Sequence, residues 1–84
     1  MKLILTPYEV AVLFRQDPAT RDDGGFQRLL ITLQELTDQQ TGEIDLPERL
    51  RERIARYAFD YGNGGWEDRL TGIFARTLGP RLGR

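Results

Sequence analysis

Three arginines at helical spacing are the residues of this chain best suited to recognise an anion. Arg49, Arg53 and Arg56 lie at positions i, i+4 and i+7, so on a helix they form one positive stripe. A guanidinium group binds a carboxylate or a phosphate through two parallel hydrogen bonds. The stripe therefore predicts contact with a protein or a nucleic acid. The alternative is a solvated face, on which the nearby Glu48 and Glu52 pair with arginines.

Aromatic side chains crowd the segment that follows the stripe. Five of them fall between residues 57 and 74, namely Tyr57, Phe59, Tyr61, Trp66 and Phe74. Phe59 lies about 200° from Tyr57 around a helix axis, so these rings cannot all point inward. Some are expected at the surface, where aromatic residues beside arginine are typical of protein-interface hot spots. The alternative is that the rings cover the corners of a small helical core.

The stretch YGNGGWEDRL, residues 61–70, is a second candidate for a binding loop. Its glycines match neither the Walker nor the dinucleotide-binding pattern, although free N–H groups at a helix N-terminus can bind an anion. A helix junction explains the same residues, because Gly62 can end one helix in a left-handed conformation and Asn63 can cap the next. We interpret the stretch as a junction in which Trp66 anchors the core.

The chain lacks the residues that most often carry catalysis or bind a metal. It contains no Cys, His or Ser, so a nucleophile would have no imidazole to activate it. The adjacent carboxylates Asp22-Asp23 and Glu67-Asp68 are explained by the preference of acidic residues for helix N-termini. We therefore expect no enzyme activity, no cofactor and no metal site.

The composition is that of an ordinary small domain. The length of 84 residues predicts one domain, residues 1–84, which an apolar core must stabilise because no disulfide can form. The net charge of −1 and the pI near 5.3 differ from the basic signature of nucleic-acid binders. No apolar run is long enough for a membrane span or a signal peptide, so a cytoplasmic location is expected.

The apolar periodicity predicts an all-α fold of four short helices, arranged as two packed α-hairpins. The first expected helix runs from Pro7 to Arg15 or Gln16, and the second from about Gly25 to Asp38. The third follows an Asp45 cap and carries its apolar stripe to Tyr61, and the fourth follows an Asn63 cap and is stopped by Gly79-Pro80. Residues 2–5 are expected to form a short strand or an extended lead-in. Residues 43–46 are expected to form a link, and residues 80–84 a frayed tail.

Capping motifs support the predicted helix starts. Thr6 with Glu9, and Asp45 with Glu48, have the spacing of capping boxes. One of the two aspartates before Gly24 is expected to cap the second helix.

A shift of 40 residues aligns the two halves of the chain. The aligned positions are Pro7 with Pro47, Gly24-Gly25 with Gly64-Gly65, Phe26 with Trp66, Leu30 with Leu70, and Leu33 with Ile73. This pattern indicates a pseudo-repeat of about 40 residues, the size of a helical hairpin. The alternative is that Pro and Gly recur at helix ends for local reasons. Both interpretations support two packed hairpins.

The chain resembles small proteins carried by phages and mobile elements, including anti-CRISPR proteins. The resemblance lies in its size, its lack of catalytic residues, its arginine bias and the stretch RYAFDYGNGGWEDRL. It implies an inhibitor that docks on a larger protein. These proteins share no common motif, so the resemblance implies no particular site residues.

The leading hypothesis is a non-enzymatic interaction protein that binds a larger protein or nucleoprotein complex and blocks or regulates it. Its expected contact surface combines the three arginines with Phe59, Tyr61 and Trp66, and Asp22 and Asp23 add to it. The alternative is a small helix-turn-helix-like nucleic-acid-binding regulator that acts as a dimer, and a third hypothesis is a self-associating structural subunit. The chain would thus be a monomer or a homodimer, without a membrane partner.

Overall fold

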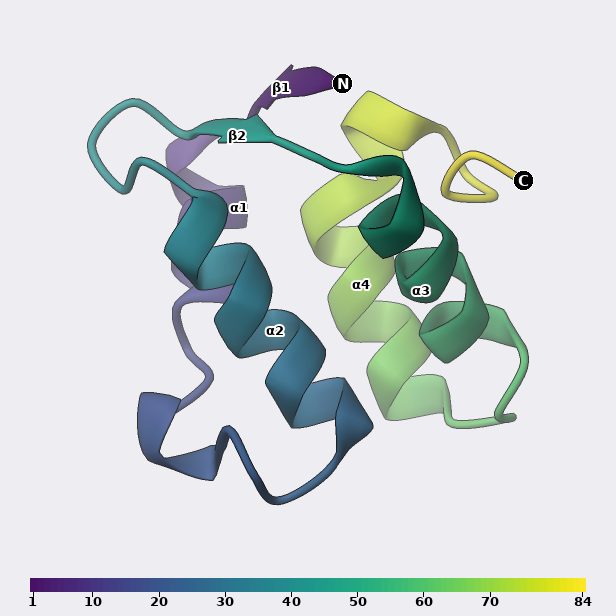
Figure 1. Cartoon of the computed structure of the whole chain (residues 1–84). Helices are drawn as coiled ribbons and strands as arrows, with labels where there is room; N and C mark the ends of the chain where they lie inside the picture. Colours follow the sequence, from purple (N-terminus) through teal and green to yellow (C-terminus); the bar gives the residue numbers. More distant parts are fainter.

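Four α-helices and a two-stranded sheet make up the structure, a computed structural model that describes residues 1–84 (Figure 1). In chain order the elements are β1 (Lys2–Ile4), α1 (Pro7–Leu13), the 3-10 helix η1 (Pro18–Thr20), α2 (Gly25–Leu36), β2 (Glu43–Asp45), α3 (Glu48–Phe59) and α4 (Gly64–Leu78). In Figure 1, α2 and α3 lie in front of α1 and α4, and the sheet lies near the top. None of the helices has the length and apolar composition of a membrane span.

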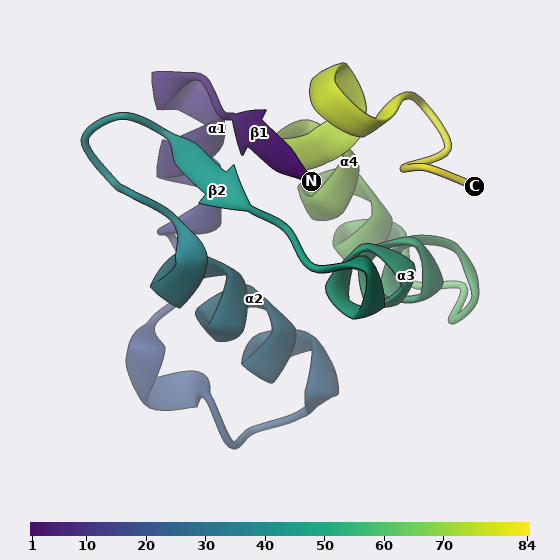
Figure 2. The same ribbon diagram turned by 45° about the horizontal axis from the view of Figure 1, so that its top comes forward.

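The sheet corrects the prediction of an all-α fold. The antiparallel pairs of β1 and β2 are Lys2 with Asp45, Leu3 with Ile44, and Ile4 with Glu43. Figure 2 shows the two strands side by side. Each strand alternates exposed, buried, exposed, so Leu3 and Ile44 face the core. The first strand agrees with the predicted extended segment. The second forms where a link is predicted, because three residues are too few to reveal a strand period in the sequence.

The first capping box is confirmed, whereas the second is wrong. The Thr6 hydroxyl accepts the Glu9 N–H (3.1 Å), and the Glu9 carboxylate accepts the Thr6 N–H (2.8 Å). Asp45 lies in β2 instead, and Pro47 occupies the N-cap position of α3 without a side-chain hydrogen bond. Pairing with β1 therefore takes priority over capping at Asp45.

Helices α1, α2 and α3 each end before the predicted residue, at Leu13, Leu36 and Phe59. At the end of α2 the sheet provides the reason. Thr37 forms an isolated bridge with Ile44, and the Asp38 N–H donates to the Glu43 carbonyl (2.8 Å). These bonds hold the chain in an extended path toward β2, which is incompatible with another helical turn.

Helix α4 is the centre of the packing. Its Leu70, Ile73 and Phe74 side chains are completely buried, and the helix packs most extensively against α3 and α1. Helices α3 and α4 form the second predicted hairpin, joined by residues 60–63. Helix α1 packs more extensively against α4 than against α2, so the first half of the chain is a more open pair. The predicted pseudo-repeat is not confirmed.

The C-terminal segment corrects the prediction of a frayed tail. Helix α4 ends at Leu78 with Gly79 as its C-cap, which confirms the predicted stop at Gly79-Pro80. The chain then turns, and Leu82 is completely buried. Two polar contacts hold the residues that follow. The Arg84 guanidinium binds the Asp60 carboxylate through two bonds of 2.6 Å, and Arg51 donates to the Gly83 carbonyl (2.9 Å). Leu82 is therefore part of the core, and these contacts hold the exposed end of the tail against α3.

Candidate functional site

The three predicted arginines lie together on the solvent side of α3. Arg49, Arg53 and Arg56 are exposed, whereas Leu50 and Ile54 of the same helix are buried. None of the three guanidinium groups takes part in an ion pair or a side-chain hydrogen bond within the chain. This set, here called the arginine stripe, is therefore free to bind an external anion.

The carboxylates near the arginine stripe mostly have other partners. Arg51 binds Glu48, and this hydrogen bond holds the pKa of the Glu48 carboxyl below its ordinary value. Arg84 binds Asp60 and likewise lowers the pKa of that carboxyl, to which the charge of Arg56 adds a smaller effect. The alternative that glutamates pair with arginines on a solvated face thus holds for Glu48. Its partner, however, is Arg51 and not a member of the stripe.

Four aromatic rings meet where α2, α3 and α4 come together, and we call them the aromatic cluster. Trp66 stacks on Phe26 with ring centroids 4.8 Å apart, and Tyr61 stacks on Tyr57 at 5.0 Å. The Trp66 ring also meets both tyrosines edge-on, at 5.6 Å and 5.7 Å. Such pairs add to the stabilisation from burial alone. Tyr61 nevertheless keeps 54% of its surface exposed, so the cluster presents a fixed aromatic edge to solvent.

Two glycines shape the backbone around this cluster. A Cβ atom on Gly25 would lie 2.0 Å from the Tyr57 hydroxyl, so only glycine lets the Tyr57 ring cross onto the start of α2. Gly62 has φ +66°, the left-handed conformation predicted for the end of the third helix. Asn63 then caps α4, because its side chain accepts the Trp66 N–H (3.1 Å). The predicted junction at residues 61–70 is confirmed.

The other predicted site residues lie at different depths. Phe59 is half-buried against the core, and it is not one of the stacked rings. Asp22 and Asp23 are exposed in the loop before α2, where neither caps the helix, since Gly24 holds the N-cap position. Asp22 pairs with Arg28 (2.7 Å).

The sequence did not identify two contributors to this region. Arg69 donates to the Gln16 side chain (2.5 Å), and its guanidinium lies 5.9 Å from the centre of the Phe26 ring. Phe26 was expected only as a core residue of its helix. The stacking of Phe26 on Trp66 depends on how distant helices pack, so no local signal in the sequence pointed to it.

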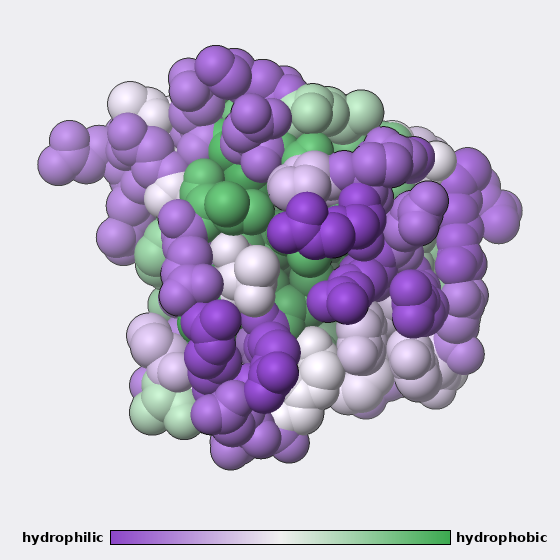
Figure 3. Space-filling model, viewed as in Figure 1, coloured by the Kyte–Doolittle hydropathy of each residue, from purple (hydrophilic) through white to green (hydrophobic).

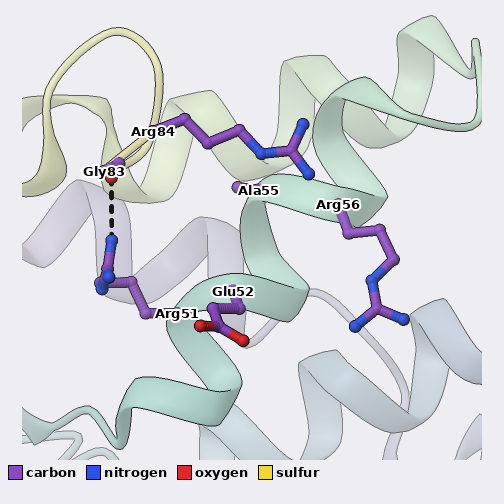
Figure 4. Close-up of a pocket in the computed structure, with 6 residues that line it drawn as sticks. All are labelled: Arg51, Glu52, Ala55, Arg56, Gly83 and Arg84. Carbon is purple, nitrogen blue, oxygen red and sulfur yellow. Dashed lines mark hydrogen bonds between the residues drawn. The ribbon is translucent and has the colours of Figure 1, made fainter.

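A cleft of about 300 Å³ opens beside Trp66. Its lining residues are Gln16, Phe26, Gln27, Gly65, Trp66 and Arg69. A second cleft of about 310 Å³ lies between α3 and the C-terminal tail, with Arg51, Arg56 and Arg84 around it (Figure 4). Internal acceptors already bind Arg51 and Arg84 there, so the second cleft has one free guanidinium, that of Arg56. The first cleft adjoins exposed aromatic surface and is the better receptor for a side chain.

One face of the molecule brings α2 and α3 to the front. Figure 3 shows an apolar strip between these helices, bordered on the α3 side by strongly hydrophilic atoms. Arg53 and Tyr57 are one turn apart on α3, so the arginine stripe continues directly into the aromatic cluster. Charged and aromatic groups therefore form one continuous surface.

Comparison with known protein families, with curated proteins and with solved structures finds no match to this chain. The site must therefore be interpreted from its own residues.

Proposed function

We propose that this protein is a non-enzymatic interaction module that docks on a larger protein or nucleoprotein complex and blocks or regulates it. The observation that carries the proposal is the continuity of three unpaired arginines with an exposed aromatic edge. We call the arginine stripe together with Tyr57, Tyr61 and Trp66 the docking surface.

The composition of this surface supports docking. Arg, Tyr and Trp are the residue types that contribute most to protein-interface hot spots. Stacking on Tyr57 and edge-on contact with Trp66 limit the motion of Tyr61 before any partner arrives. A rigid contact residue loses less conformational entropy on binding, which favours affinity. The resemblance to anti-CRISPR proteins in size, arginine bias and lack of catalytic residues adds support for an inhibitor of a larger complex.

Nucleic-acid binding is the second candidate, because free guanidinium groups also suit phosphates. The charge distribution favours the first. The whole chain carries a net charge of −1, so no long-range field attracts a polyanion. A self-associating subunit is the third candidate, since two copies could bury the same aromatic edge.

Affinity purification from the native host, with and without nuclease, distinguishes these candidates. We expect a stoichiometric protein partner that survives nuclease treatment. Arg53→Glu or Tyr61→Ala should abolish its capture. Arg15→Glu is the matched control, because Arg15 is also exposed and unpaired but lies outside the docking surface. Retention that depends only on nucleic acid, or self-association without another protein, would contradict the proposal.

A further inference from the structure

The geometry points to an acidic amphipathic segment of the partner protein as the ligand of the docking surface. Its carboxylates would bind the arginine stripe, and a large apolar side chain next to them would bind at Trp66. This inference rests on the docking function proposed above and adds the chemistry of the partner.

The unpaired charges define the first requirement. No carboxylate of the chain forms an ion pair with the arginine stripe, so a contacting protein surface can supply acceptors to all three guanidinium groups. Arg49 and Arg53 are four residues apart, about 6 Å along the helix axis. Acidic residues at i and i+4 on a partner helix have the same spacing, so two carboxylates of one helix can bind both arginines.

The acidic residues around the stripe favour separate carboxylates over a phosphate chain. Glu52 and Asp60 lie one turn before and one turn after Arg56, and both are exposed. A continuous sugar-phosphate backbone following this row would run over the unpaired carboxylate of Glu52 and over Asp60, which Arg84 already binds. A protein segment can place its carboxylates on the arginines and keep neutral residues opposite Glu52 and Asp60. The mixed charge pattern therefore selects a protein ligand.

The cleft beside Trp66 defines the second requirement. Phe26 and Trp66 are its two apolar lining residues, and Gln16, Gln27 and Arg69 supply polar groups. A volume of about 300 Å³ is at the small end of ligand pockets, which suits one large side chain rather than an extended molecule. A Leu, Phe or Met beside the acidic residues would thus be buried against aromatic surface, as interface anchors are.

Nuclear magnetic resonance titration of the whole ¹⁵N-labelled protein with defined probes tests this inference. The first probe is a synthetic helical peptide of about 16 residues, long enough for measurable helicity, with Glu at i, i+4 and i+7 and one Leu a turn further on. The second probe replaces each Glu by Gln. The third is single-stranded oligothymidylate of similar length.

We expect the Glu peptide to shift the amide signals of the arginine stripe and the indole signal of Trp66. The Gln peptide should bind at least about fivefold more weakly than the Glu peptide. The Arg53→Glu substitution should lower the affinity for the Glu peptide by a similar factor. Arg15→Glu changes the net charge equally and should leave its affinity unchanged. Raising the salt from about 50 to about 500 mM should weaken binding further, because exposed charges are screened.

Three results would overturn the inference. They are tighter binding of the oligothymidylate at the same residues, equal binding of the Glu and Gln peptides, and the absence of binding by either peptide at millimolar concentration. Each would leave the docking function intact if a protein partner is still captured through Tyr61. The loss of that partner would instead contradict the docking function itself.

Discussion

Glu9 is the one acidic side chain that the fold buries, and it joins three parts of the chain. It completes the capping box with Thr6 at the start of α1. It also accepts hydrogen bonds from Arg76 of α4, at 2.9 and 3.1 Å, while Arg76 donates to the Ile4 carbonyl at the end of β1 (2.6 Å). Burial raises the pKa of the Glu9 carboxyl, but the hydrogen bonds and charge of these partners outweigh burial and lower the pKa below its ordinary value.

This lowered pKa predicts acid sensitivity. A carboxyl group whose pKa is lower in the folded state contributes stability above its unfolded pKa, and that contribution is lost as the pH falls. The free energy of unfolding should therefore decrease as the pH drops below about 4.5. Glu9→Gln should lower the free energy of unfolding at pH 7 by about 1–3 kcal/mol and flatten its pH dependence.

Urea denaturation at several pH values measures this effect. Glu52→Gln is the matched control, because Glu52 is exposed and forms no ion pair, and it should leave the pH dependence as it is. An unchanged pH profile in Glu9→Gln would contradict the assigned role of Glu9.

Alanine substitution is predicted to have opposite effects at Gly25 and at Gly64. Gly25→Ala would place its Cβ 2.0 Å from the Tyr57 hydroxyl, so the ring must move and the protein should lose about 1–3 kcal/mol. Gly64→Ala meets no atom within 4 Å and should be neutral or stabilising by up to about 1 kcal/mol. Thermal unfolding measures both. Tyr57→Phe removes the closest atom, so the cost of Gly25→Ala should fall in that background.

At the scale of elements, the parts of the fold that depend on neighbouring residues could be predicted from the sequence. The Thr6 cap, the Asn63 cap and the stop of α4 at its C-cap Gly79 all follow from residues within one turn. The sheet and the tail could not be predicted, because both depend on contacts between distant residues. Leu3 pairs with Ile44 across the chain, and nothing local marks Leu82 as a core residue.

The C-terminal tail predicts an unusual sensitivity near the end of the chain. Leu82 is completely buried although its φ of +54° is unfavourable for a non-glycine residue. Leu82→Ala keeps this backbone cost and removes the buried side chain, so it should cost about 2–4 kcal/mol of unfolding free energy. Leu36→Ala is the control, since Leu36 is 41% exposed and its loss should cost less than about 1 kcal/mol. Equal, small effects in denaturant unfolding would show a frayed tail.

For the molecule as a whole, the sequence predicted the composition of the candidate site better than its arrangement. Helical spacing placed the arginine stripe on one exposed face, because a single helix fixes that geometry. The aromatic cluster needs three helices, so its stacking partners depend on tertiary packing. Phe26 and Arg69 join it for that reason, and Phe59 packs against the core instead.

Arginine labelling with phenylglyoxal, read by mass spectrometry, tests most directly whether the arginine stripe is the contact surface. The free protein offers five arginines without internal partners, namely Arg15, Arg49, Arg53, Arg56 and Arg81. In the complex with the captured partner, the three members of the stripe should lose reactivity, while Arg15 and Arg81 should keep it. Protection of Arg15 or Arg81 with an unchanged stripe would contradict the proposed docking surface.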